Sequence, residues 1–192
     1  IGNYFLSYCY SFNQLLDISN VTSIGNYFLQ YCYSFNQPLD ISNITSIGND
    51  FLSNCYSFNQ PLTIPDNVTS IGNYFLSYCY SFNQLLDINN VTSIGSQFLS
   101  YCYSFNQNIS IPSNLTSIGT NFMERCYSLS TITYNATVFP TDDNTLAQNQ
   151  NSKTSTNGAG ILVFGTQRAG LLIALPDRAT DPYRKLIDGG AD

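Results

Sequence analysis

The stretch Cys32–Asn43, CYSFNQPLDISN, is one of several near-copies in this chain. Its first six letters, CYSFNQ, begin at five cysteines, and a degraded copy, CYSLST, begins at a sixth; the six are Cys9, Cys32, Cys55, Cys79, Cys102 and Cys126. The pair Ile-Gly keeps the same rhythm, at Ile1, Ile24, Ile47, Ile71, Ile94 and Ile118. Both marks recur every 23 or 24 residues. Such a fixed period indicates an array of structurally equivalent units.

Periods in the twenties are typical of leucine-rich-repeat-like solenoids, in which each unit forms one coil. Leu39–Ile41 and Val21–Ile24 have the pattern of short strands. Asn26–Cys32 spaces its apolar residues like one helical turn, with Gly25 available to turn the chain before it. We therefore predict an α/β-type repeat solenoid over residues 1–134: a right-handed coil of six units with parallel β ladders and short helical turns.

Stacking would place each residue type directly above its own copy, so an inward side chain must suit the same slot in every coil. The pair Asn36-Gln37 and its copies are expected to form a polar ladder that bridges backbone groups of adjacent coils. The six cysteines are expected to be free, buried thiols that act as small apolar groups. Their even number leaves disulfides as the alternative, whereas no short Cys-x-x-Cys pair suggests zinc.

Residues 135–192 are predicted to cap the solenoid, because a last coil otherwise exposes its core and an open sheet edge. A polar loop over 135–160 would lead to strands at Ile161–Phe164 and Leu171–Leu175 and to a short helix from Asp181. At the other end, Ile1-Gly2-Asn3 is the middle of a repeat. We therefore expect a longer protein, and the lack of a signal sequence carries no information.

Composition disfavours several functions. Charged residues make up only 9% of the chain, and residues 1–124 hold six acids but no lysine or arginine, which argues against a nucleic-acid partner. The longest apolar stretch, from Ile161, is interrupted by Gln167-Arg168 and argues against direct membrane insertion. The chain has no histidine and no glycine-rich phosphate loop. We therefore predict no enzyme activity, no cofactor and no metal site.

Variation between copies indicates where a ligand would bind. The tyrosine after each cysteine never changes, which favours packing or a stacked ladder. The positions one and five residues before each cysteine tolerate Asp, Asn, Gln and Arg and should face water. Tyrosines in those two positions are the candidate ligand-binding residues: Tyr4, Tyr8, Tyr27, Tyr31, Tyr74, Tyr78 and Tyr101. Exposed tyrosines suit glycans and proteins, although tyrosine could also serve as a soluble filler on a charge-poor surface. The competing site is an acidic strand face, suited to a cationic partner or calcium, with Asp17, Asp40 and Asp87.

The segment Ile64–Cys79, IPDNVTSIGNYFLSYC, resembles the BspA-type leucine-rich repeats of bacterial surface proteins. The variant with FNQPL is similar to repeat arrays in surface lipoproteins of wall-less bacteria, and the tail is similar to the closing cap of such arrays. The resemblance implies adhesion or partner binding, to protein or glycan, at a cell surface, in secreted form or on a virus or phage particle. It implies no catalytic residues. A structural stalk or spacer, or an accessory domain of an enzyme lying upstream, remains the alternative.

Overall fold

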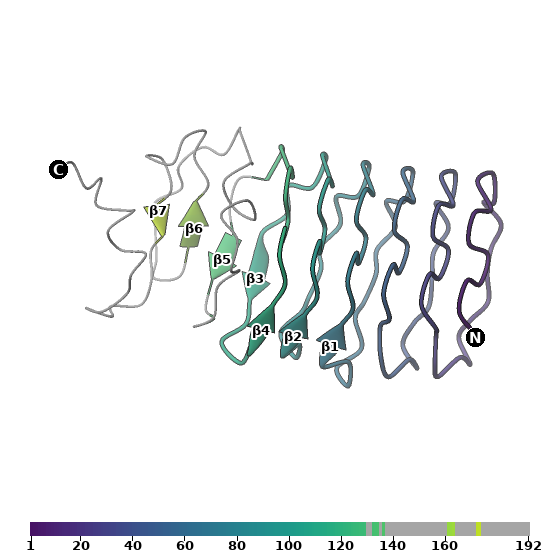
Figure 1. Cartoon of the computed structure of the whole chain (residues 1–192), viewed down its shortest axis with the longest axis horizontal. Coiled ribbons are helices and arrows are strands. Elements are labelled where there is room, and N and C mark those ends of the chain that lie inside the picture. The colour runs from purple at the N-terminus through teal and green to yellow at the C-terminus, as the bar shows by residue number, and fades with distance from the viewer. Residues whose placement is uncertain (130–131, 135, 137–160, 164–171, 174–192) are drawn as a thin grey trace.

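The computed structural model describes residues 1–129, 132–134, 136, 161–163 and 172–173. Successive repeat units form loops that stack side by side along the long axis of the molecule (Figure 1). Equivalent backbone groups bond between adjacent coils: Gly25 N donates to Ile1 O at 2.9 Å, and Gly95 N donates to Ile71 O at 2.9 Å. The predicted repeat solenoid with parallel strands is therefore confirmed.

The strands are short and lie in two sheets. β1 (Ser70–Ile71), β2 (Ser93–Ile94) and β4 (Ser117–Ile118) pair in parallel in the order β1-β2-β4. An isolated parallel bridge between Ile47 and Ile71 extends this row by one coil. β3 (Ile109–Ile111) pairs in parallel with β5 (Ile132–Tyr134), and the sheet continues antiparallel through β6 (Ile161–Val163) to β7 (Leu172–Ile173). Figure 1 shows the lower row of β1, β2 and β4 and the row from β3 to β7.

The strand expected at Leu39–Ile41 does not form, and its aspartate supplies the reason. Asp40 Oδ1 accepts the backbone N–H of Ser42 at 3.0 Å, and Asp17 does the same with Ser19 at 3.1 Å. This local Asx turn bends the chain directly after the aspartate and competes with an extended ladder. Strands β3 and β5 form where two adjacent coils carry Ser110 and Thr133 in the aspartate position, whereas Thr63, between the coils of Asp40 and Asp87, lies in no strand. Val21–Ile24 is likewise not a strand, although its copies β1, β2 and β4 are.

The core consists of stacked columns of identical side chains. Two columns of phenylalanine rings run through the coils at centroid separations of 5.3–6.0 Å, with Phe28 and Phe35 among their fully buried members. Leucine, isoleucine and cysteine columns fill the remaining interior, as Leu52, Ile71 and Cys79 show. Repetition in sequence therefore corresponds to repetition of one packing slot.

The predicted helical turn is wrong: no helix occurs among the described residues. In its place, every second residue of the segment has a positive φ, with Tyr27 at 63°, Leu29 at 54° and Tyr31 at 60°. Gln30 N donates to Tyr27 O and Cys32 N to Leu29 O, which closes consecutive turns whose third residue has φ > 0. All six coils repeat this pattern.

Bonds between coils explain why the segment does not become helical. Tyr27 N donates forward to Asn49 O at 2.8 Å, whereas Leu29 N donates backward to Phe5 O at 3.0 Å. A helical turn would direct both N–H groups along its own axis and leave this side of the solenoid unbonded. The alternating backbone thus joins each coil to both neighbours, at roughly 1–2 kcal/mol of steric strain per non-glycine residue with positive φ.

The repeated glycine is required for close approach rather than for capping a helix. A Cβ at Gly72 would lie 2.5 Å from the carbonyl carbon and oxygen of Gly48 in the preceding coil. The asparagine that follows completes the contact, because Asn26 Oδ1 accepts the backbone N–H of Asn49 at 2.8 Å. Glycine therefore keeps the coils close enough for this asparagine ladder.

The predicted polar ladder at the second Asn position is confirmed. Asn59 Oδ1 accepts the backbone N–H of Asn83 at 2.8 Å and the side-chain Nε2 of Gln84 at 3.0 Å. Gln84 Nε2 also lies 3.2 Å from the backbone oxygen of Asn59. Each Asn-Gln pair thus satisfies polar groups of the coil before it.

Past the last parallel strand, β6 and β7 occupy the two segments where the sequence predicts cap strands. They extend the sheet from β5, which would otherwise end in an open edge. Apart from Ala136, the predicted loop over 135–160 and the helix from Asp181 lie outside the described residues. The boundary between solenoid and cap at residue 134 stays a prediction.

Candidate functional site: a tyrosine face

Two parallel rows of side chains stand on the positive-φ side of the coils. Row one contains Tyr4, Tyr27, Asp50, Tyr74, Gln97 and Asn121, and row two contains Tyr8, Tyr31, Asn54, Tyr78, Tyr101 and Arg125. All twelve residues have positive φ. Both rows are exposed at the first coil, where the exposed fractions of Tyr4 and Tyr8 are 59% and 55%, and most of their inner members are half-buried. The structure therefore places all seven candidate tyrosines on one side of the solenoid, through alternating φ rather than through a helix.

Neighbouring rings within each row stack face to face. Tyr4 and Tyr27 lie 4.4 Å apart at an interplanar angle of 5°, and Tyr78 and Tyr101 lie 4.3 Å apart at 11°. Stacking fixes each ring in a plane across the solenoid axis. The surface is therefore preorganised and presents ring edges and hydroxyl groups outward.

A third row lies beside row two and forms the stacked ladder that was one of the two roles expected for the tyrosine after each cysteine. It is an unbroken stack of six rings with centroid spacings of 4.4–5.3 Å: Tyr10, Tyr33, Tyr56, Tyr80, Tyr103 and Tyr127. It contacts row two edge-on, with Tyr8 and Tyr10 at 6.4 Å and Tyr31 and Tyr33 at 6.2 Å. Its inner members are half-buried, and Tyr10, in the open first coil, is 50% exposed. We call the three rows together the tyrosine face.

Several hydroxyls of the tyrosine face have raised pKa values and stay protonated at neutral pH. Burial, followed by neighbouring tyrosines, raises the pKa of Tyr56 and of Tyr78 to about 12. The pKa of Tyr27 is raised mainly by Tyr4, then by burial and by the charge of Asp50. These hydroxyls are therefore neutral donors and acceptors for a partner.

Rows one and two are interrupted at the third coil, where Asp50 and Asn54 stand in tyrosine slots. Asp50 is only 9% exposed, and its Oδ1 accepts a hydrogen bond of 2.8 Å from Gln30 Nε2. Burial raises the pKa of Asp50, while hydrogen bonds from Gln30 and Ser53 oppose that rise. The break is therefore polar and carries a carboxylate below the level of the rings.

The competing acidic strand face is arranged for local turns. Asp17 and Asp40 accept hydrogen bonds from Ser19 and Ser42, which lower the pKa of both carboxyl groups, and in Asp40 this outweighs repulsion from Asp17. Asp87 accepts the N–H of Asn89 at 2.9 Å in the same way. Mutual repulsion therefore does not raise the pKa of either Asp17 or Asp40 above its ordinary value.

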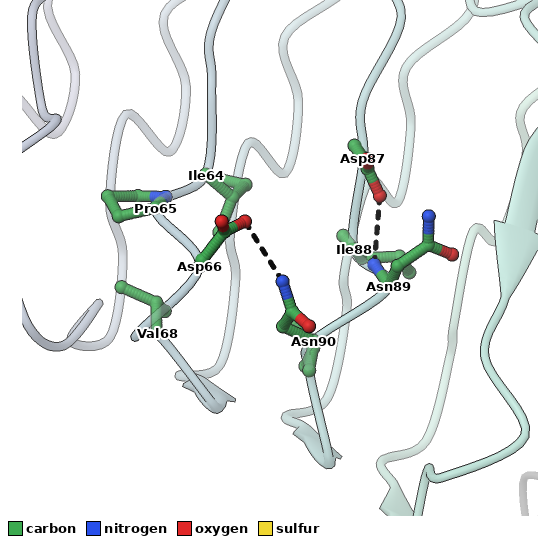
Figure 2. A pocket seen from close by; sticks show the side chains of 9 residues that line it. Ile64, Pro65, Asp66, Val68, Asp87, Ile88, Asn89 and Asn90 are labelled. Atoms are coloured by element: carbon green, nitrogen blue, oxygen red, sulfur yellow. Dashed lines mark hydrogen bonds between the residues drawn. The ribbon is translucent and has the colours of Figure 1, made fainter.

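A small pocket opens on this side between the third and fourth coils (Figure 2). Asn90 Nδ2 donates to Asp66 Oδ1 at 2.9 Å across it, and Asp87 lies above. Its volume of about 10 Å³ admits roughly one water molecule. Within the described part of the chain, no group of three or more Cys, Asp or Glu side chains could hold a metal ion.

The cysteines lie inside the solenoid, away from both faces. Each thiol from the second coil onward donates to the leucine carbonyl of the coil before, as in Cys55 Sγ to Leu29 O at 3.1 Å and Cys79 Sγ to Leu52 O at 3.1 Å. All six are free. Burial raises the pKa of Cys32 to about 12, so the thiol stays neutral. Cysteine thus fits an interior slot that needs a small apolar side chain with one weak donor.

The fold and repeat define a leucine-rich-repeat solenoid with one aromatic face. The family model for the BspA-type leucine-rich repeat region, six copies, matches residues 22–153, so the chain belongs to the BspA-type leucine-rich-repeat family. A search of curated proteins finds no significant match.

A solved structure supports the same assignment. The crystal structure of a leucine-rich cell surface protein from Faecalibacterium prausnitzii A2-165 is similar to this chain, with a TM-score of 0.58 and 28% sequence identity. The similarity covers 72% of this chain and 37% of that one. This chain therefore spans little more than a third of the length of that surface protein. Among the described residues, no helix is long and apolar enough to cross a bilayer.

Proposed function

We propose that this chain is a non-catalytic protein-binding module of a surface-exposed protein and that its tyrosine face makes the contact. The observation that carries the proposal is the continuity of the face: the tyrosines gather in three adjoining rows instead of scattering around the coils. A spacer gains nothing from collecting half-exposed rings on one side. Rigid tyrosines offer a large contact area for few frozen torsions, which suits recognition.

Family membership and the leucine-rich surface protein of similar structure support a location at a cell surface. The acidic balance of residues 1–124 favours a partner with basic character. Protein is favoured over glycan because the rows present ring edges, whereas sugars usually stack on open ring faces, and here most ring faces cover one another.

The test uses the double variant Tyr27→Ser/Tyr31→Ser. Asp50 and Asn54 already occupy these slots in the third coil, so the variant should fold. Peptides are selected on the wild-type chain from a random displayed library, and a glycan array is probed in parallel. We expect selected peptides to bind the variant at least tenfold more weakly and Asp17→Asn/Asp40→Asn unchanged.

Loss of binding only in the aspartate variant would move the site to the strand face. Glycan binding without peptide binding would replace protein by carbohydrate as the ligand. If no probe binds in a manner sensitive to the tyrosines, the chain is a spacer.

A further inference from the structure

The break in the tyrosine face contains a charge that the fold does not need. Asp50 and Asn54 sit at positive φ of 57° and 61°. Asparagine and aspartate both tolerate that backbone better than tyrosine does, so conformational relief explains a short polar residue in either slot. It does not explain a buried carboxylate, because an asparagine at position 50 would relieve the same strain without desolvating a charge.

No cation in the chain's first coils neutralises Asp50. Residues 1–124 contain no lysine or arginine. The bonds that reach the carboxylate come from neutral groups, the Gln30 amide and the Ser53 hydroxyl. Buried carboxylates are ordinarily paired with a cation, and among the described residues no cation bonds to Asp50, so the charge is left for a partner to supply.

The rings beside Asp50 present the surface that a planar cation prefers. Tyr27 stacks on Tyr4, and Tyr31 stacks on Tyr8, so both rings are covered on the side of the first coil. Toward the third coil neither ring meets another stacked ring among the described residues, since Asp50 and Asn54 stand there. The charge of Asp50 contributes to the raised pKa of Tyr31, after burial and Tyr8, which places the carboxylate within electrostatic reach of that ring.

The sixth coil shows the complete arrangement within one chain. Arg125 occupies the row-two slot there, and its guanidinium carbon lies 5.1 Å from the centroid of the Tyr101 ring in the coil before. Its Nε lies 3.5 Å from Glu124 Oε1. Asn121, in the row-one slot, donates to Glu124. A tyrosine ring, a guanidinium and a mostly buried acid thus meet at one place on the face.

The third coil holds the same parts without the guanidinium. Asp50 occupies the slot of Asn121 in the sixth coil, and Ser53 occupies the slot of Glu124. The acid and its neutral partner have exchanged places, and in both coils they are hydrogen-bonded to each other. Tyr31 corresponds to Tyr101, and Asn54 occupies the slot of Arg125. Asparagine is too short to cover the ring of the preceding coil as arginine does.

We propose that this break is a receptor for an arginine side chain of the protein partner, whose guanidinium stacks on Tyr31 and pairs with the carboxylate of Asp50. A stacked, charge-paired guanidinium gains both a cation–π contact and a hydrogen-bonded ion pair. Arginine fits better than lysine because its planar group can stack and bond at once. The inference rests on the proposed function and names the chemistry that the tyrosine face recognises.

The probe is a peptide, Gly-Ser-Arg-Ser-Gly, with citrulline and lysine versions as controls; citrulline keeps the shape of arginine and lacks its charge. The peptides are titrated into protein with isotope-labelled tyrosine rings and followed by NMR. We expect saturable shifts of the Tyr31 and Tyr27 resonances with arginine, weaker shifts with lysine and none with citrulline. Asp50→Asn should weaken arginine binding at least tenfold, while Asp40→Asn leaves it unchanged.

Asn54→Arg is the decisive variant, because it copies the sixth coil and supplies the guanidinium from within. It should fold at least as well as the wild type and abolish arginine-peptide binding, although Asp50 and Tyr31 are intact. Equal binding of citrulline, full binding by Asp50→Asn or unimpaired binding by Asn54→Arg would overturn the proposal. If library-selected peptides still depend on Tyr27 and Tyr31 in that case, the tyrosine face stands as the binding surface and only the arginine receptor falls.

Discussion

The polar ladder should be worth more to stability in the middle of the solenoid than at its first coil. Asn59→Ala removes the oxygen that accepts the backbone N–H of Asn83 at 2.8 Å and the Gln84 amide at 3.0 Å. Leaving a buried N–H without an acceptor costs about 1–3 kcal/mol, and the lost hydrogen bond from Gln84 adds about 0.5–1.5 kcal/mol. Both groups are half-buried, so we expect a loss of about 2 kcal/mol, near the lower end of that sum.

For a chain of this size, such a loss lowers the melting temperature by about 4–8 °C. Thermal unfolding followed by circular dichroism measures the shift, and hydrogen exchange of the Asn83 amide should become faster. Asn59→Asp is the matched control, because its carboxylate keeps both acceptor bonds. Asn13→Ala removes equivalent bonds where water can replace them and should cost less. Equal losses in the Ala and Asp variants of Asn59, or a shift below about 1 °C for Asn59→Ala, would refute the reasoning.

Three further outcomes follow from burial and close contact. Thiol labelling of native protein should reach Cys9, which is partly exposed, and spare the other five cysteines until the protein unfolds; fewer than six free thiols after unfolding without reductant would contradict this. Asp50→Asn should raise the melting temperature at pH 7, because burial raises the folded-state pKa of Asp50 above its ordinary value of 3.8. The gain in melting temperature should disappear below pH 3.8, and an equal gain at pH 3 would contradict the reasoning. In urea unfolding, Gly72→Ala should lower the free energy of unfolding by about 1–3 kcal/mol, because the added carbon overpacks the contact between coils. Gly2→Ala, with nothing within 4 Å of the added carbon, should leave that free energy unchanged.

The repeat period was enough to predict the solenoid, because stacking demands identical side chains at identical slots. The Asn-Gln ladder followed from the same logic and from the need to satisfy backbone groups at a bend. The strand at Leu39–Ile41 could not be predicted correctly from alternation alone. Whether a strand forms there depends on whether the Asp40 side chain accepts a hydrogen bond from the nearby backbone or leaves that backbone free to pair with the adjacent coil.

The positive-φ run was missed for a physical reason. Local preference disfavours φ > 0 for tyrosine and leucine, and the apolar spacing of Phe28, Leu29 and Cys32 fits a helical turn equally well. The competing influence is tertiary, because the alternating N–H groups bond to acceptors 22 to 25 residues away, in the neighbouring coils. Asp50 and Asn54 carried a usable signal: two residue types that tolerate left-handed backbone stand four apart in equivalent slots.

The strained backbone and the tyrosine face are one feature of this fold. The residues with positive φ are tyrosine, leucine, aspartate, asparagine, glutamine, methionine and arginine, and none is β-branched. A branched Cβ adds to the left-handed clash with the following carbonyl, so valine, isoleucine and threonine are the residues that these slots reject most strongly. The two outward slots of each coil are therefore free to vary among aromatic, amide, acidic and basic side chains while the leucine between them holds the core. Tyr31, Asn54 and Arg125 occupy the same slot in different coils, so the face can change its ligand chemistry one coil at a time without altering the solenoid that carries it.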